Sequence, residues 1–145
     1  MNVIKRDGRT ENVMFDKITS RIQRLCYGLT NVDAISISQK VIQGVFDGVA
    51  THKLDDLASE VCASLCSHHP EYSQLAGRIT VSNLHKRTDK TFSDVVEKLM
   101  NRKNSEGQPA PGISDKLYEI VFKNKDFVDS VIVYDRDYNL SLIHI

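Results

Sequence analysis

The stretch "VIKRDGRTENVMFDK", residues 3–17, decides the fold at the start of this chain. Asp7-Gly8 predicts a two-residue hairpin turn of type I′, because both residues tolerate the positive φ angles that this turn requires. The flanking strands are expected at about residues 3–6 and 9–13. Beyond them apolar residues recur at helical spacing. The stretch therefore predicts a β-hairpin that leads directly into a helix.

Four apolar series follow the hairpin and predict four helices. Asp16 is placed to cap the first helix and Gly28 to end it, and Pro70 suits the first position of the fourth. The expected fold is mainly α, with the hairpin as a lid on a four-helix unit. The inward residues of the four helices are expected to be Ile18, Ile22, Leu25 and Leu29; Ile37, Val41, Val45 and Val49; Leu54, Leu57, Val61 and Leu65; and Leu75, Ile79 and Leu84.

A further helical segment is expected after these four helices. A shorter helix starts at Ser93, and residues 101–112, with two prolines and two glycines, predict a loop or boundary. Residues 114–135 then predict one or two more helices.

The composition is that of an ordinary globular protein. The chain has 145 residues, of which 41% are hydrophobic and 26% charged, enough for one domain or slightly more. Its 19 basic residues balance 19 acidic ones, so general attraction to nucleic acid is not expected. No apolar run approaches the ~20 residues of a membrane span, and no signal peptide is recognisable. Together with three cysteines, an odd number, this predicts a cytoplasmic protein with reduced thiols and no membrane contact.

Phosphate binding would depend on side chains here, because neither a G-x-x-x-x-G-K-[ST] loop nor a G-x-G-x-x-G turn is present. The candidate cations are Lys5, Arg6, Lys17 and Lys86. A solvated charged face is the alternative interpretation of the same residues. Gly44 and Gly48 form a GxxxG pattern, which in such a chain favours close helix packing over a binding site.

A metal site or a catalytic centre has little support. Cys62 and Cys66 share a helix face near His68 and His69, but structural zinc sites commonly use C-x2-C pairs, and no second pair follows. Small buried thiols are the favoured interpretation. His85 has no visible nucleophile or carboxylate partner, so no catalytic residue and no intrinsic metal site are expected.

Five stretches, in order and at matching spacing, resemble the large subunit of class I ribonucleotide reductase of the eukaryotic type. They are "VIKRDGRTENVMFDKITSRIQRLCYGL", "KVIQGVFDGV", "HPEY…LAGRITVSNLHK", "FSDVVEKL" and "VIVYDRDYN". The resemblance implies an ATP-cone allosteric domain at 1–91, a hairpin lid on a four-helix bundle, and the start of a helical N-terminal region at 92–139. Residues 140–145 do not match and are expected to be a truncated end. The catalytic barrel would be absent.

The resemblance also implies an effector site for ATP or dATP, with Mg²⁺ on the phosphates. Lys5, Arg6 and Lys86 would contact the phosphates, and Thr51 and Asp55 would lie by the ribose and base. Asn12 occupies a position where the family commonly has a basic residue. The segment expected to line the pocket is Glu11, Asn12, Val13, Met14, Phe15, Asp16 and Lys17.

The function implied is control of overall ribonucleoside-diphosphate reductase activity in deoxyribonucleotide synthesis. ATP would support activity and dATP would suppress it through self-association of the subunit, which also works with a small radical-generating subunit. The family's catalytic cysteines lie in the barrel, so Cys26, Cys62 and Cys66 are not expected to be those residues, and this chain alone is expected to be inactive.

Three alternatives stay open. The helices could form an interaction module that needs no nucleotide, or the cone could be degenerate. A cone-bearing transcriptional regulator is disfavoured, because its zinc ribbon needs paired cysteines and the chain has no C-x-x-C.

Overall fold

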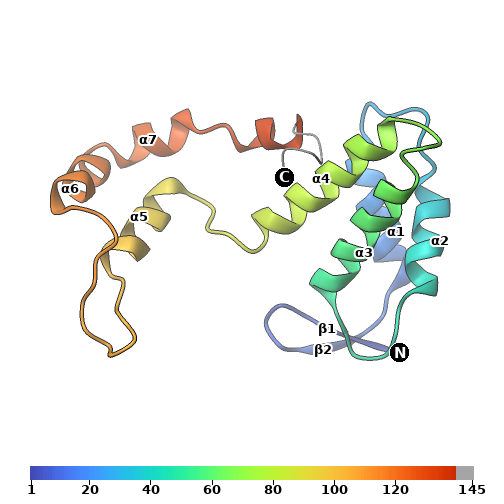
Figure 1. The fold of residues 1–145 in the computed structure, drawn as a ribbon, viewed down its shortest axis with the longest axis horizontal. Helices are drawn as coiled ribbons and strands as arrows, with labels where there is room; N and C mark the ends of the chain where they lie inside the picture. Colours follow the sequence, from blue (N-terminus) through green and yellow to red (C-terminus); the bar gives the residue numbers. More distant parts are fainter. Residues whose placement is uncertain (140–145) are drawn as a thin grey trace. The chain divides into compact units, whose positions relative to one another are not determined.

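A computed structural model of the chain describes residues 1–139 (Figure 1). The expected truncated end at 140–145 lies outside the described residues. The chain forms two compact units, one of residues 1–84 with 136–139 and the other of residues 85–135. Helices dominate both units, which confirms the mainly-α prediction.

A small sheet stands at one end of the first unit. Its strands are β1 (Asn2–Ile4), β2 (Thr10–Asn12) and β3 (Val49–Ala50), in the order β2-β1-β3. β1 pairs antiparallel with β2 and parallel with β3, where Val3 lies opposite Val49. The prediction that Val49 belongs to a helix is therefore wrong, because the chain turns at Gly48 with φ +78° and Val49 continues as a strand.

The hairpin turn differs from the predicted type I′ turn. The Gly8 N–H donates to the Lys5 carbonyl at 3.0 Å, and the Lys5 N–H donates to the Arg9 carbonyl at 2.8 Å. Gly8 has φ +83°, while Asp7 does not have a positive φ. This is the pattern of a type I turn followed by a glycine bulge. Asp7 instead accepts the Arg9 N–H through its carboxylate, which stabilises the turn from outside.

Four helices complete the first unit: α1 (Phe15–Leu25), α2 (Ala34–Gln43), α3 (Thr51–Ser64) and α4 (Glu71–His85). The predicted cap at Asp16 is wrong, because α1 begins at Phe15 and Asp16 lies in its first turn. There its charge still interacts favourably with the helix dipole. Asp33 does cap α2, since its carboxylate accepts the N–H groups of Ile35 and Ser36.

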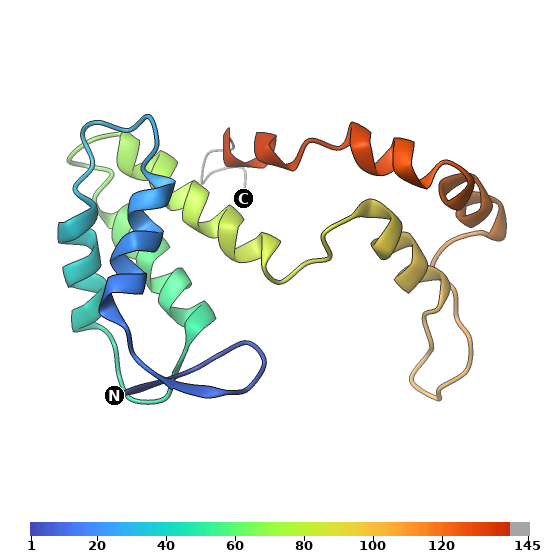
Figure 2. The same ribbon diagram turned by 180° about the vertical axis from the view of Figure 1, so that it is seen from behind.

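The four helices lie side by side (Figures 1 and 2), and buried apolar side chains from all four form their common core. Leu84 is 50% exposed, so its predicted inward position is wrong. The main core comprises Ile22, Ile37, Val41, Ala58, Cys62, Leu75, Ala76 and Ile79. A second cluster joins the sheet to the helices through Val3, Val45, Val49 and Leu54. Full burial of each valine, leucine or isoleucine among them contributes about 1.5–3 kcal/mol.

The second unit contains α5 (Phe92–Met100), α6 (Asp115–Lys123) and α7 (Lys125–Val131). A short 3-10 helix, Tyr134–Asn139, follows. Asp129 of α7 accepts both the N–H and the hydroxyl of Ser93 at the start of α5, which holds these two helices together. No helix within residues 1–139 is long and apolar enough to cross a membrane.

Candidate functional site

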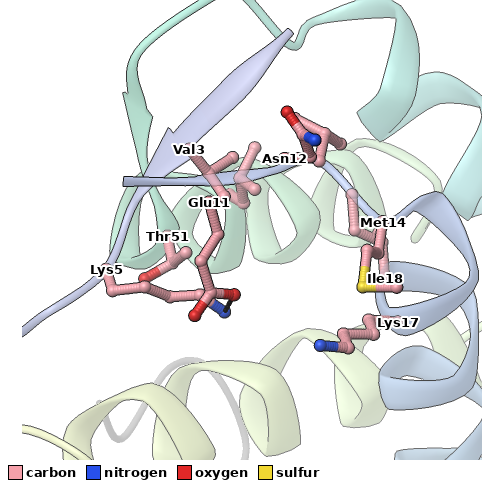
Figure 3. Close-up of a pocket in the computed structure, with 10 residues that line it drawn as sticks. Val3, Lys5, Glu11, Asn12, Met14, Lys17, Ile18 and Thr51 are labelled. Carbon is pink, nitrogen blue, oxygen red and sulfur yellow. Dashed lines mark ion pairs between the residues drawn. The ribbon is translucent and has the colours of Figure 1, made fainter. Parts of the chain in front are cut away.

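A pocket lies under the hairpin, between the start of α1 and the start of α3 (Figure 3). It exists because Gly8 turns the second strand back over the bundle and the chain enters α1 immediately after it. The lining residues are Val3, Lys5, Glu11, Asn12, Val13, Met14, Lys17, Ile18, Thr51 and Leu54.

The pocket combines apolar walls with two cations. Val3 and Leu54 are buried and Ile18 is half-buried, so they provide an apolar surface. Lys5 pairs with Glu11 at 3.2 Å between Nζ and Oε2, and both side chains are partly exposed. Lys17 extends from α1 toward the same opening from the other side (Figure 3). The arrangement offers positive charge next to an apolar surface, which suits a ligand with an anionic and an aromatic part.

The residues proposed from the sequence are distributed over four places. Phe15 and Asp16 lie in the first turn of α1, outside the pocket lining. Arg6 and Asp55 form an ion pair of their own. Lys86 directly follows α4 and belongs to the second unit. The remaining residues line the pocket together: Lys5, Glu11, Asn12, Val13, Met14, Lys17 and Thr51.

Asp55 is the centre of a charged cluster beside the pocket. It is only 6% exposed, and its two carboxylate oxygens contact different guanidinium groups. Arg6 Nη2 lies 3.1 Å from Oδ2, and Arg21 Nη1 lies 2.7 Å from Oδ1. Burial lowers the pKa of Arg21, and the neighbouring Asp55 carboxylate acts in the opposite direction. A buried carboxylate with two cationic partners joins the hairpin, α1 and α3.

Asn83 extends this cluster to α4. Its Oδ1 accepts from Arg6 Nη2 at 2.5 Å, and its Nδ2 donates to Asp56 Oδ1 at 2.7 Å. Arg21 also donates to the Ser82 hydroxyl at 3.3 Å. The tip of the hairpin is thus held by side chains of α3 and α4, and Arg21 joins α1 to the same cluster.

Sequence reasoning missed Arg21 and Asn83. Arg21 follows Lys17 by four residues, so the two share one face of α1, and this spacing could have indicated it. Asn83 is a polar residue inside an otherwise apolar helical pattern, which could have marked a buried partner. Neither signal identifies Asp55 or Arg6 as the contact.

The cysteines Cys62 and Cys66 are free thiols that are buried or half-buried. Cys62 is fully buried, and burial raises the pKa of its thiol to about 12, so it is protonated at neutral pH. Cys66 is half-buried and lies beyond the end of α3 at Ser64, so the prediction that the two thiols share a helix face is wrong. Within residues 1–139 no three side chains of metal-binding type lie together.

Comparison with protein families assigns the first unit. The sequence profile of the ATP cone domain matches residues 1–87, more than half of the chain. The chain belongs to the ATP-cone family. The hairpin, the four helices and the pocket between them are therefore the parts of an ATP cone.

Similar proteins extend the match beyond the cone. The ribonucleoside-diphosphate reductase large chain of Schizosaccharomyces pombe is 57% identical over 95% of this chain. Large chain 2 of Saccharomyces cerevisiae is 55% identical over 95%, and the large subunit of vaccinia virus is 54% identical over 96%. This chain spans 17%, 16% and 18% of the lengths of these three proteins. The resemblance to the N-terminal region of the reductase large subunit is confirmed.

Proposed function

We propose that this ATP cone is the regulatory region of a ribonucleoside-diphosphate reductase large subunit and binds ATP or dATP under its hairpin. The observation that carries the proposal is the pocket, in which Lys5 and Lys17 flank the apolar surface of Val3, Ile18 and Leu54. Such a site suits a nucleotide, since it offers point charges for phosphates and an apolar surface for a base.

The phosphates are bound by cations that lie far apart in the sequence. Lys5 and Lys17 line the pocket. Arg6 joins them when the ligand is bound, and a phosphate contact by Lys86 stays a prediction from the resemblance. Glu11 must then release Lys5 to the phosphates, and its carboxylate would be a suitable ligand for a Mg²⁺ ion that accompanies them. Each charge-assisted contact contributes about 1.5–3 kcal/mol.

The sugar and base are recognised at the start of α3 and along the segment that enters α1. Thr51 lines the pocket, and Asp55 lies one helical turn further along α3. Phe15 and Asp16 complete the segment that begins with Glu11. ATP and dATP differ by one hydroxyl. A protein group that hydrogen-bonds this hydroxyl in ATP is left unpaired with dATP, and this produces a difference in binding free energy.

Regulation follows from a difference in what the two nucleotides stabilise. ATP supports activity, while dATP favours a self-associated, inactive state of the large subunit, which works in the cytoplasm with a small radical-generating subunit. The two effectors must differ by a coupling free energy of about 1–3 kcal/mol between these states. In this proposal the allosteric domain comprises residues 1–91, and residues 92–139 begin the helical region that leads to the catalytic part.

Titration calorimetry of ATP and dATP into the 145-residue chain tests the proposal. Saturable binding is expected, and Lys17→Ala is expected to weaken it at least about tenfold, because one charge-assisted contact is lost. Lys40→Ala, which removes an exposed cation from α2, is the matched control and is expected to bind like the original chain. A folded chain that binds neither nucleotide would contradict the proposal and favour an interaction module. Equal losses in both variants would place the phosphates elsewhere.

A further inference from the structure

We propose that Arg6 acts as a latch on the hairpin. Without nucleotide, its guanidinium is held by Asp55 and Asn83. When a nucleotide binds, Arg6 moves to the phosphates, and Arg21 stays paired with Asp55. This inference rests on the proposed function, since it describes how the hairpin responds when the effector binds. Arg21 and Asn83 are positioning residues in it and make no contact with the nucleotide.

Arg6 is held away from the pocket by its contacts with α3 and α4. Its neighbour Lys5 lines the pocket, but Arg6 does not, and one of its nitrogens contacts both Asp55 and Asn83. The Arg6 side chain is 30% exposed, whereas that of Asp55 is 7% exposed. The cation can therefore turn toward solvent or a ligand, while the carboxylate has to stay. Release of Arg6 would remove the side-chain contacts that anchor the tip of the hairpin to α3 and α4.

Arg21 makes release of Arg6 possible. Removing the partner of a buried carboxylate normally leaves an uncompensated charge, which is strongly unfavourable. Here Arg21 lies 2.7 Å from the second oxygen of Asp55, so one positive and one negative charge remain when Arg6 leaves. The Ser82 hydroxyl holds the Arg21 guanidinium in place. Without Arg21, Asp55 would have to retain Arg6.

Asn83 contributes to holding Arg6 without adding charge. Its side-chain oxygen accepts from Arg6, and its amide donates to Asp56, which is partly exposed and can be hydrated instead. Loss of Asn83 weakens the latch and leaves no buried charge unpaired. It thus lowers the free energy needed to release Arg6.

The two positioning residues are therefore expected to act on nucleotide affinity in opposite directions. Arg21→Gln should raise the Kd for ATP about tenfold, because Arg6 is then retained by Asp55. Asn83→Ala should lower the Kd about threefold, since a larger fraction of the chain is already released and competent to bind. If the cluster served only to stabilise the fold, both substitutions would weaken binding or leave it unchanged.

The test is ATP titration of the 145-residue chain, with folding of each variant checked by circular dichroism and thermal melting. Arg24→Gln removes an exposed cation from the same helix and controls for net charge; its Kd should be unchanged. Arg21→Lys keeps the charge and should restore most of the affinity. Amide hydrogen exchange at Lys5 and Gly8 gives a second readout without nucleotide, and Asn83→Ala should accelerate it.

Each outcome has one interpretation. Opposite shifts in Kd, with faster exchange in Asn83→Ala, support the latch. If the unmodified chain binds ATP but both substitutions shift the Kd the same way or not at all, the latch is overturned and the proposed function stands. If the unmodified chain binds no ATP, the proposed function is wrong, and so is the proposed transfer of Arg6 from Asp55 to the phosphates.

Discussion

Glu71, at the start of α4, shows how one surface carboxylate joins segments that are far apart in the sequence. Its Oε2 accepts the backbone N–H groups of Thr30 and Asn31 at 2.9 and 2.7 Å, and its Oε1 accepts from the Asn31 side chain. The hydrogen bond from the Asn31 backbone is the main cause that lowers the pKa of Glu71. The charged form is therefore favoured in the folded chain, and the loop between α1 and α2 is held to the start of α4.

Glu71→Gln is expected to destabilise the chain in a pH-dependent way. Because the folded-state pKa is lowered, the contribution of Glu71 is present above its ordinary value of 4.5 and is lost as pH falls through the lowered pKa. Urea unfolding of both forms from pH 7 to pH 3 should show a constant difference above about pH 4.5 that shrinks below it. Glu60→Gln, on an exposed part of α3, is the control. A difference that stays constant down to pH 3 would contradict this account.

The pairing of helices depends on small residues where backbones come close. Gly44 ends α2 against α3, and a Cβ added there would lie 2.8 Å from the Leu57 side chain. The interpretation of the Gly44–Gly48 pattern as close packing is confirmed for Gly44. Gly48 has a different role, because its positive φ turns the chain into β3. The same two glycines thus serve packing at one position and backbone conformation at the other.

Gly44→Ala is expected to lower the free energy of unfolding by only about 1 kcal/mol, because the new methyl group displaces the tip of the flexible, partly buried Leu57 side chain. Thermal or urea unfolding measures the loss. In the Leu57→Ala background the same substitution should cost much less, since the clashing atoms are gone. Additive effects of the two substitutions would show that the contact does not limit the packing of α2 on α3.

The whole chain has zero net charge, so its interaction with anions depends on how the fold arranges its cations. Lys5 and Lys17 both line the pocket, whereas Arg6 and Arg21 are both paired with the single carboxylate of Asp55. This arrangement is suited to binding an anion. The only cysteine among the buried core residues, within residues 1–139, is Cys62, and its thiol is protonated at neutral pH.

The 145-residue chain is expected to bind nucleotide without reducing it. The reason is that it corresponds to the cone-bearing region of relatives that are far longer. Incubation of the purified chain with a ribonucleoside diphosphate, the small subunit and a dithiol reductant should yield no deoxynucleotide above the level without the chain. Turnover that depends on the chain would contradict this prediction, and a complete reductase in parallel serves as the positive control.

Much of the fold and part of the site follow from local patterns, because a turn or an amphipathic helix is specified by residues close in sequence. The Asp7-Gly8 hairpin, the four helices and the cation at Lys17 are recognisable in this way. The predicted type of turn was wrong, since only Gly8 of the pair has a positive φ, and Asp7 instead accepts a hydrogen bond through its carboxylate.

Contacts between distant residues arise only in the folded chain, where packing brings them together. Val49 has the spacing of a helical residue, but it belongs to a strand because it pairs with Val3 of β1. The pairing of Asp55 with Arg6 and Arg21 joins residues 49 and 34 positions apart, and no local pattern encodes it. The sequence therefore specifies which side chains are available to the site, and long-range packing determines which of them are free for a ligand and which are already paired.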